Sequence, residues 1–252
     1  MGAAAALWPV WGIDQPQLSD DQINQIIQSF AAKETEFARA RENYTYRQTA
    51  SVQELDEFGN PRGRWEMTSD IIFSLDGKRT EKVVRAPVST LRNISLDPQD
   101  EQDLREVQPF VLTTTQLPQY LVRYLGKQKV DEIPCYVFAA KPKTLEAGKR
   151  YFSGMIWVDD RDLQIVKSYG RGVGLLKKNA NNAYPKFETY REQIDGKYWF
   201  PTYTRADDVL QFPSGESQRI RMIVRYEDYK QFKSESDIKY GAPIETNEEK
   251  KP

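Results

Sequence analysis

Two acidic stretches contain the residues whose types and spacing most resemble a chemical site: residues 159–162, which read DDRD, and the adjacent pair Asp207 and Asp208. A calcium loop needs a glycine at its sharp bend and a distant bidentate glutamate, and residues 159–162 have neither, so they predict a solvated hairpin turn. Adjacent residues of a strand face opposite sides, so Asp207 and Asp208 share an acid–base site only if a bulge intervenes. We therefore expect no catalytic residue in either stretch.

The chain lacks the side chains that most catalytic and metal sites use. It contains no histidine, and Cys135 is its only cysteine. The absence of histidine removes the commonest general base and the commonest metal ligand. A single cysteine excludes an internal disulfide and a cysteine cluster. Cys135 lies in the apolar run IPCYVF, which predicts a small buried residue rather than a reactive thiol. We expect a protein that is not an enzyme and has no cofactor and no metal.

The glycine-rich stretch at residues 170–174, GRGVG, resembles a phosphate-binding loop. Such a loop opens a helix, whereas the residues that follow, LLKKNANNAYP, predict none. Leu175 and Leu176 stand between glycines and lysines, where no sheet would bury them. They form either a loop tip folded back on the sheet or a tip that contacts a membrane or a partner protein.

The charge balance excludes nucleic acid as a partner. Lysine and arginine number 36 and aspartate and glutamate 37, so the net charge is −1. Arg219, Arg221 and Arg225 fall on one face of a strand, but acidic residues are interleaved with them. We expect this strip to be the solvent-facing side of a sheet.

One amphipathic helix is predicted at residues 20–42. Ser19 and Gln22 have the spacing of a capping box, and Ile23, Ile26, Ile27, Phe30, Ala31, Phe37 and Ala38 then fall on one side at helical spacing. A second, shorter helix is expected at about residues 97–107, with Asp97 as its cap and Pro98 at its first position.

Outside these helices the apolar period changes to two, which is typical of strands. Turn-forming dipeptides separate about nine to eleven such strands, and we expect them to form one antiparallel meander. The fold class is therefore α+β: a single curved antiparallel sheet, with the helix at residues 20–42 packed on its concave face.

Three segments carry a resemblance to a known family: YLVRYLGKQKVDEIPCYVFAAKPK, YFSGMIWVDDRDLQIVKSYG and DGKYWFPTYTR. Together they resemble the LolA/LolB-like outer-membrane lipoprotein-sorting superfamily, over residues 116–232. The resemblance implies a curved antiparallel sheet shaped like a half-open barrel, with helices lying across its concave face as a lid. It also implies an acyl chain or other apolar ligand between sheet and lid, and a location in the periplasm. Related sensor proteins bind regulatory partners on a similar domain.

The expected domain organisation has three parts. Residues 1–18 are interpreted as a signal-peptide remnant or flexible segment, residues 19–233 as a single LolA/LolB-like domain, and residues 234–252 as a polar tail. No run of 18 apolar residues occurs, so no bilayer-spanning helix is expected.

Two functions follow from these expectations. The first is a non-enzymatic periplasmic carrier that shelters lipoprotein acyl chains or another lipid. The second is a protein-interaction or envelope-stress signalling domain whose pocket is filled by its own side chains. For the carrier we expect an apolar cavity beneath the helix, lined by Ile26, Ile27, Phe30, Trp65, Met67, Ile71, Phe73, Tyr136, Phe138, Met222 and Val224. An envelope protein partner and peripheral membrane contact through Leu175 and Leu176 are compatible with either function.

Overall fold

The protein is described from a computed structural model, which covers residues 18–74, 78–97, 100, 103, 108–175, 185–212 and 214–232. The expected N-terminal segment, except residue 18, and the expected polar tail lie outside these residues. The strands are β1 (Tyr44–Leu55), β2 (Pro61–Phe73), β3 (Arg79–Arg85), β4 (Tyr120–Val130), β5 (Ile133–Pro142), β6 (Tyr151–Asp159), β7 (Ile165–Val173), β8 (Phe187–Gln193), β9 (Trp199–Gln211) and β10 (Ser217–Gln231).

The helix α1 (Asp20–Arg41) begins as the sequence predicts. The Ser19 side chain accepts a hydrogen bond from the Gln22 backbone N–H at 3.2 Å, and the Gln22 side chain accepts one from the Ser19 N–H at 2.9 Å. This capping box satisfies two backbone donors that the first turn would otherwise leave unpaired.

The strands form one open antiparallel sheet with the order β3-β2-β1-β10-β9-β8-β7-β6-β5-β4. The expected single meander is therefore wrong in one respect: β1 pairs with β10, and β3 and β4 are the two edges. The reason is the long connector at residues 86–119, which leaves the sheet after β3 and returns at β4 through the short 3₁₀ helix η2 (Leu117–Gln119). Tight turns specify neighbouring strands, whereas a connector of this length does not.

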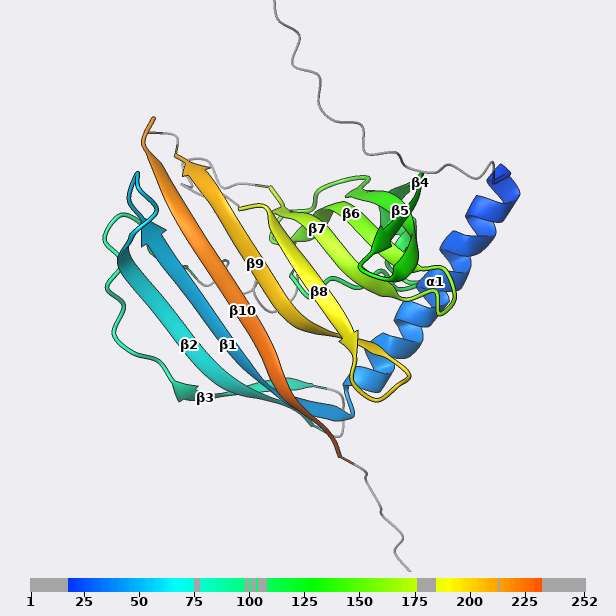
Figure 1. The fold of residues 1–252 in the computed structure, drawn as a ribbon, viewed down its shortest axis with the longest axis horizontal. Coiled ribbons are helices and arrows are strands. Elements are labelled where there is room, and N and C mark those ends of the chain that lie inside the picture. Colours follow the sequence, from blue (N-terminus) through cyan, green and yellow to red (C-terminus); the bar gives the residue numbers. More distant parts are fainter. Residues whose placement is uncertain are drawn as a thin grey trace, which may run out of the picture.

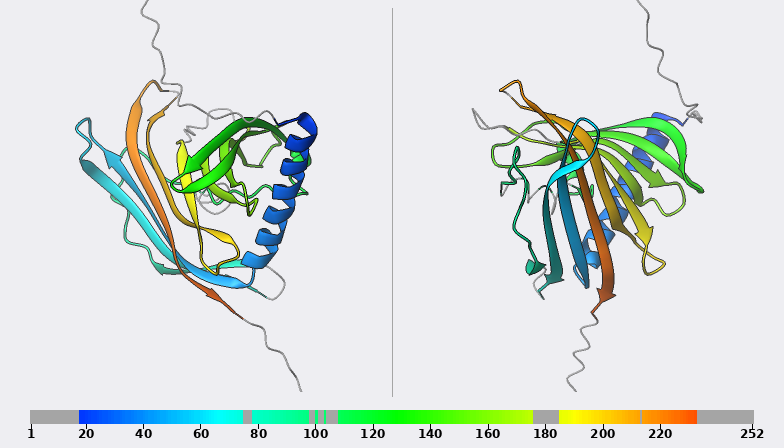
Figure 2. Two further views of the ribbon diagram at one scale, coloured as in Figure 1. Left: turned by 45° about the vertical axis from the view of Figure 1, so that its right-hand side comes forward. Right: turned by 60° about the vertical axis from the view of Figure 1, so that its left-hand side comes forward.

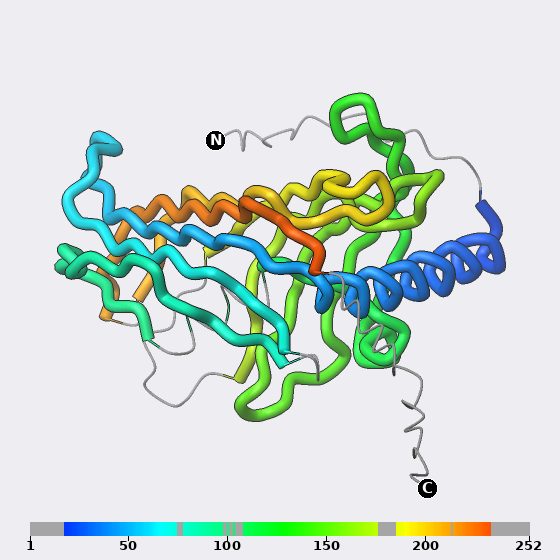
Figure 3. Tube along the Cα trace, turned by 90° about the horizontal axis from the view of Figure 1, so that it is seen from below, coloured from blue at the N-terminus to red at the C-terminus, as the bar shows by residue number. Residues whose placement is uncertain are grey.

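The sheet curls, and α1 lies across the open side of the curl (Figures 1 and 2). Seen from below, α1 leads directly into β1, so the helix and the first strand run in nearly one line (Figure 3). Among the described residues there is one α-helix of more than a single turn, and the expectation of several helices on the concave face is overstated. The expected second helix at residues 97–107 falls largely outside the described residues.

The main core lies on the concave face. Phe30 and Ala31 of α1, Phe138 of β5, Phe152 of β6 and Val224 of β10 belong to it and are almost completely buried. The connector packs against the same core, because the ring of its Phe110 stacks on Phe152 with centroids 4.4 Å apart. The concave face is thus covered partly by α1 and partly by the connector.

A smaller apolar cluster lies on the convex face of β5–β7. It contains Cys135, Val137, Trp157 and Val166, with Trp199 packed at its edge. Cys135 is fully buried, as predicted, and burial raises the pKa of its thiol to about 12. A protonated, enclosed thiol of this kind is a packing residue at neutral pH.

Candidate functional site

The interface between α1 and the sheet is filled by the protein's own side chains. Phe30 packs on Phe138 with ring centroids 5.3 Å apart, and Phe37 meets Phe200 edge-on at 5.2 Å. Phe30, Ala31 and Phe37 are completely buried. The sequence predicted an apolar cavity beneath the helix, but Ala31 is enclosed there in one buried cluster with Phe30 and Phe138.

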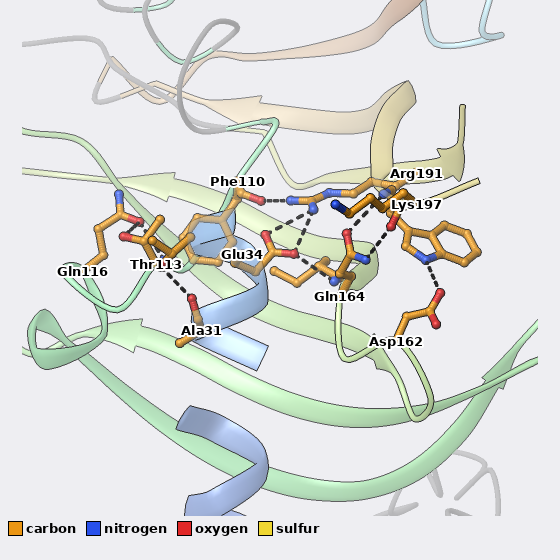
Figure 4. Close-up of polar contacts among 12 residues, drawn as sticks. Ala31, Glu34, Phe110, Thr113, Gln116, Asp162, Gln164, Arg191 and Lys197 are labelled. Atoms are coloured by element: carbon orange, nitrogen blue, oxygen red, sulfur yellow. Dashed lines mark hydrogen bonds and ion pairs between the residues drawn. The ribbon is translucent and has the colours of Figure 1, made fainter. Parts of the chain in front are cut away.

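At the centre of this interface lies a buried ion pair, Glu34 with Arg191 (Figure 4). The Arg191 guanidinium donates to both carboxylate oxygens of Glu34, at 3.1 and 3.2 Å, and to the carbonyl oxygen of Phe110. Glu34 also accepts a hydrogen bond from the Ile165 N–H at 3.0 Å. Burial lowers the pKa of Arg191, and the charge of Glu34 opposes this shift. The pair connects α1, β7, β8 and the connector.

A cavity of about 380 Å³ lies elsewhere on the concave face, between the sheet and the connector. Its floor comes from β1, β8, β9 and β10, and its roof consists of residues 93–97 together with Asp100, Asp103 and Gln108. The apolar lining residues are Val52, Ile94, Leu96, Pro185, Phe187, Leu210, Phe212, Ile220 and Met222. The volume and the mostly apolar floor are typical of a site for a small apolar or amphiphilic ligand.

The roof is held at one end by Glu54, a β1 residue that is almost completely buried. Its carboxylate accepts hydrogen bonds from the backbone N–H groups of Arg92, Asn93 and Ile94, at 3.0, 2.6 and 2.8 Å. Three donors on one carboxylate form a strong, charge-assisted anchor. The connector is thereby fixed over the sheet where the cavity begins.

The other end of the roof is held by Gln108. Its backbone carbonyl accepts a hydrogen bond from the Thr189 hydroxyl at 2.9 Å, and its side-chain Nε2 donates to the Met222 Sδ at 3.2 Å. The side-chain Oε1 of Gln108 is buried, and none of the described residues donates a hydrogen bond to it. This atom belongs to a residue of the cavity lining.

The remaining polar lining residues are acidic or neutral: Asp97, Asp100, Asp103 and Glu216 are acidic, and Asn93, Ser95 and Ser214 are neutral. Asp97 and Asp100 bond reciprocally, each side chain accepting from the other residue's backbone N–H at 2.9 Å. Asp103 accepts from the Arg150 Nε at 2.8 Å. Burial raises the pKa of Asp100 to about 6. The hydrogen bond from the Asp97 N–H opposes this shift, and the charges of Asp97 and Asp103 add to it. Within the described part of the chain, no group of three histidine, cysteine, aspartate or glutamate residues is placed to hold a metal ion.

The structure places the predicted lining residues on the concave face but mostly away from this cavity. Met222 lines it, and the other ten are not among its described lining residues. Ile27, Phe30, Phe138 and Val224 belong to the concave core, with Ile26, Trp65 and Tyr136 packed against it. Ile71 and Phe73 are buried on β2, and Met67 is half-buried opposite Ala50. Of the predicted contact loop, Leu175 is exposed and Leu176 lies outside the described residues.

Sequence reasoning missed the roof. Strand alternation contained a signal for the floor, because Leu210, Ile220 and Val52 fall in phase with the apolar faces of their strands. Ile94 and Leu96 lie in an irregular segment whose apolar residues follow neither a helical nor a strand period. The hydrogen-bond partners of Glu54 and Gln108 are distant from them in the chain.

The motifs first considered for catalysis have structural roles. Asp159 accepts from the Arg161 N–H at 2.7 Å within the predicted turn, and Asp160 pairs with Lys127 at 2.8 Å. Asp207 pairs with the half-exposed Arg219 and Arg221, at 3.0 and 3.1 Å. The basic strip is therefore the charged outer surface that the sequence predicted.

Asp208 takes no part in that cluster, because it accepts a hydrogen bond from the Lys186 N–H at 2.9 Å. The two adjacent aspartates thus have separate partners. The segment GRGV continues β7 as a strand. No helix that the structure describes is long and apolar enough to cross a membrane.

Several solved proteins are similar in structure to this chain, among them the following three. For a DUF1329 family protein from Desulfovibrio piger the identity is 15%, the coverage 85% of this chain and 93% of that chain, and the TM-score 0.45. A LolA superfamily protein from Nitrosomonas europaea is 12% identical, with 83% of this chain and 93% of that chain covered and a TM-score of 0.35. A putative outer membrane lipoprotein-sorting protein domain from Vibrio parahaemolyticus is 11% identical, with 79% of this chain and 90% of that chain covered and a TM-score of 0.35.

No protein-family model matches the chain, and no curated protein matches it. The solved proteins similar in structure include a LolA superfamily protein and a putative outer membrane lipoprotein-sorting protein domain. At these identities and TM-scores the likeness assigns neither a ligand nor an activity to this chain.

Proposed function

We propose that this chain is a non-enzymatic periplasmic binding or carrier protein that shelters an acyl chain or another lipid in the cavity between its sheet and its connector. The observation that supports this proposal is the cavity of about 380 Å³, whose floor is formed by Val52, Phe187, Leu210, Ile220 and Met222. A cavity floored by apolar side chains offers no hydration to a guest, so an apolar chain gains free energy by entering it.

The volume is sufficient for weak, measurable binding of an apolar chain. At about 30 Å³ for each methylene-sized group, the cavity holds roughly a dozen such groups. Each buried methylene contributes about 0.8 kcal/mol, so a guest of this size gains roughly 9–10 kcal/mol. Association costs about 4 kcal/mol or more, so about 5–6 kcal/mol at most remains, which corresponds to a Kd of about 0.1 mM or weaker.

In this proposal the predicted lining residues divide into two groups. Met222 contacts the ligand, while Ile26, Ile27, Phe30 and the aromatic residues around them hold α1 on the sheet and fix its curvature. Leu175, which is exposed, is the proposed point of contact with a membrane or a partner protein.

The test compares two substitutions on the same strand. Ile220, on the concave side of β10, lines the cavity, and Ile223, three residues further on, faces the convex side. Ile220→Trp fills the cavity and is expected to weaken uptake of a fluorescent dodecanoyl probe at least tenfold, whereas Ile223→Trp leaves uptake within about twofold. Mass spectrometry of lipid extracted from the purified wild type identifies any natural ligand.

The second candidate is the protein-interaction or signalling domain. The filled interface between α1 and the sheet is the observation that favours it. If the wild type binds no apolar probe and yields no lipid on extraction, the carrier function is wrong and the interaction domain becomes the better proposal.

A further inference from the structure

Phe187, on β8, lines the cavity and is almost completely buried. Its side chain lies on the side of β8 that faces the connector, because Thr189, two residues further along the strand, donates its hydroxyl to the connector there. Beyond β7, on β6, the centroid of the Phe152 ring lies 6.1 Å from that of Phe187. Phe187 therefore separates the cavity from the aromatic core.

The core behind Phe187 is already filled. Phe152 is stacked on Phe110 of the connector with centroids 4.4 Å apart, and both rings are buried. Gly170, the β7 residue opposite Phe187, has no side chain, and a Cβ at that position would lie 2.8 Å from a carbon of the Phe152 ring. The Phe152 ring thus occupies the space over β7. A ligand chain that reaches Phe187 meets close-packed side chains and extends no further.

The strand register places Phe187 at the inner end of the cavity. Phe187, Ala206 and Met222 lie in one row across β8, β9 and β10. From this row the cavity lining continues along β9 to Phe212. Residues 206–212 span about 20 Å at about 3.3 Å per residue, a depth sufficient for one extended chain.

The outer end of the cavity is in contact with solvent. Its lining there includes Ser214 and Glu216 of the β9–β10 turn, both of which are exposed. Between this turn and Phe187, the buried residues Leu210 and Ile220 provide apolar surface. A polar head group can stay hydrated at the turn while its chain extends over these residues towards Phe187.

We propose that Phe187 sets the length of the chain that the cavity binds. The ligand is a single unbranched alkyl or acyl chain of about a dozen carbons, the number that the cavity volume holds. Its terminal methyl group lies against Phe187, and its head group lies at the β9–β10 turn. This inference rests on the proposed function and narrows it, because carbons beyond this length stay in water and a second chain has no space.

The experiment is a chain-length series with one head group. Decyl-, dodecyl- and tetradecylphosphocholine, each below its micelle concentration, are titrated into the full chain by isothermal titration calorimetry. Each buried methylene strengthens binding about fourfold, so the step from decyl to dodecyl is expected to lower the Kd about tenfold. The step from dodecyl to tetradecyl is expected to change the Kd of the wild type less than about twofold, because the added methylenes find no space.

Phe187→Ala assigns this limit to one ring. The removed ring leaves space for about three or four methylene-sized groups, so the step from dodecyl to tetradecyl should now lower the Kd about tenfold. Phe187→Leu, with an expected gain of about threefold, serves as the second variant if Phe187→Ala does not fold.

Phe200→Ala is the matched control. Phe200 is similarly buried, but it packs with Phe37 and Tyr44 and is not among the described lining residues of the cavity. This variant is expected to keep the wild-type difference of less than about twofold between dodecyl and tetradecyl.

The outcomes separate this inference from the function it rests on. If the wild type gains as much from dodecyl to tetradecyl as from decyl to dodecyl, the chain-length inference is wrong and apolar binding stands. If Phe187→Ala folds and keeps the wild-type difference, or if Phe200→Ala gains as much as Phe187→Ala, the assignment to Phe187 is wrong. If no compound binds to the wild type, the proposed function itself is wrong.

Discussion

Glu34 on α1 and Arg191 on β8 form an ion pair from which water is excluded, with side-chain exposures of 0% and 2%. These residues are 157 positions apart in the chain. Because Arg191 also holds the carbonyl of Phe110, one pair connects the helix, the sheet and the connector that covers the cavity.

The first prediction concerns this pair. Glu34→Leu leaves the Arg191 charge buried without a counter-charge and is expected to lower the free energy of unfolding by about 3–5 kcal/mol. Chemical denaturation followed by circular dichroism measures the change. Glu36→Gln, which breaks the exposed pair with Lys33, is the matched control and is expected to cost less than about 1 kcal/mol. Equal losses in the two variants would contradict a structural role for the buried pair.

The second prediction separates the two possible places for a ligand. Ala31 is completely buried in the interface between α1 and the sheet, whereas the adjacent Ala32 is exposed. Ala31→Trp is expected to destabilise the protein by about 1–3 kcal/mol or more through overpacking, and Ala32→Trp to leave its stability nearly unchanged. If Ala31→Trp instead kept full stability and lost probe uptake, the ligand site would lie under the helix, as the sequence first indicated.

The third prediction concerns the anchor of the roof. Glu54→Gln replaces one acceptor oxygen by a donor that faces the N–H groups of residues 92–94, and it is expected to cost about 1–3 kcal/mol. Hydrogen exchange at the amides of Asn93 and Ile94 should accelerate in this variant. Glu57→Gln, an exposed glutamate in the turn after β1, is the control. Unchanged exchange at both amides would show that Glu54 does not hold the connector.

The fourth prediction concerns pH. The pKa of Asp100 is about 6 in the folded protein against an ordinary value of 3.8, so the folded state binds more protons than the unfolded chain between these values. Through this group, stability rises as pH falls from above 6 towards 4. Asp100→Asn removes the cost of the partly buried charge, so the variant is expected to be more stable than the wild type at pH 7–8, by about 1–2 kcal/mol after solvent screening is taken into account. That advantage should disappear near pH 4.

Asp70 provides a control of opposite sign. Its hydrogen bond with Arg47 lowers the pKa of its carboxyl group, so its contribution to stability is present at neutral pH and is lost on acidification. Asp70→Asn should therefore be less stable than the wild type at pH 7, and the difference should shrink below pH 4. If the Asp100 and Asp70 variants showed pH profiles of the same sign, the assigned cause of the Asp100 shift would be wrong.

The sequence by itself determined the features that depend on neighbours along the chain. The capping box of Ser19 and Gln22 begins α1, and the DDRD turn joins β6 to β7, because each is completed within a few residues. Alternation of apolar residues likewise identified the strands and, for Met222 and Val224, the concave side of β10. The burial of Cys135 followed from the apolar run around it.

The tertiary structure alone decided where open space remains on the concave face. The pairing of β1 with β10, the carboxylate of Glu54 on residues 92–94 and the pair of Glu34 with Arg191 join segments far apart in the chain. No periodicity records such contacts, because periodicity reports which side of an element is apolar and not what packs against it. Phe30 and Phe138 fill the space beneath α1, whereas the anchored connector leaves a cavity over Ile220 and Met222. Whether an apolar face is filled or left open depends on the packing of side chains from several distant segments, which exists only once the chain has folded.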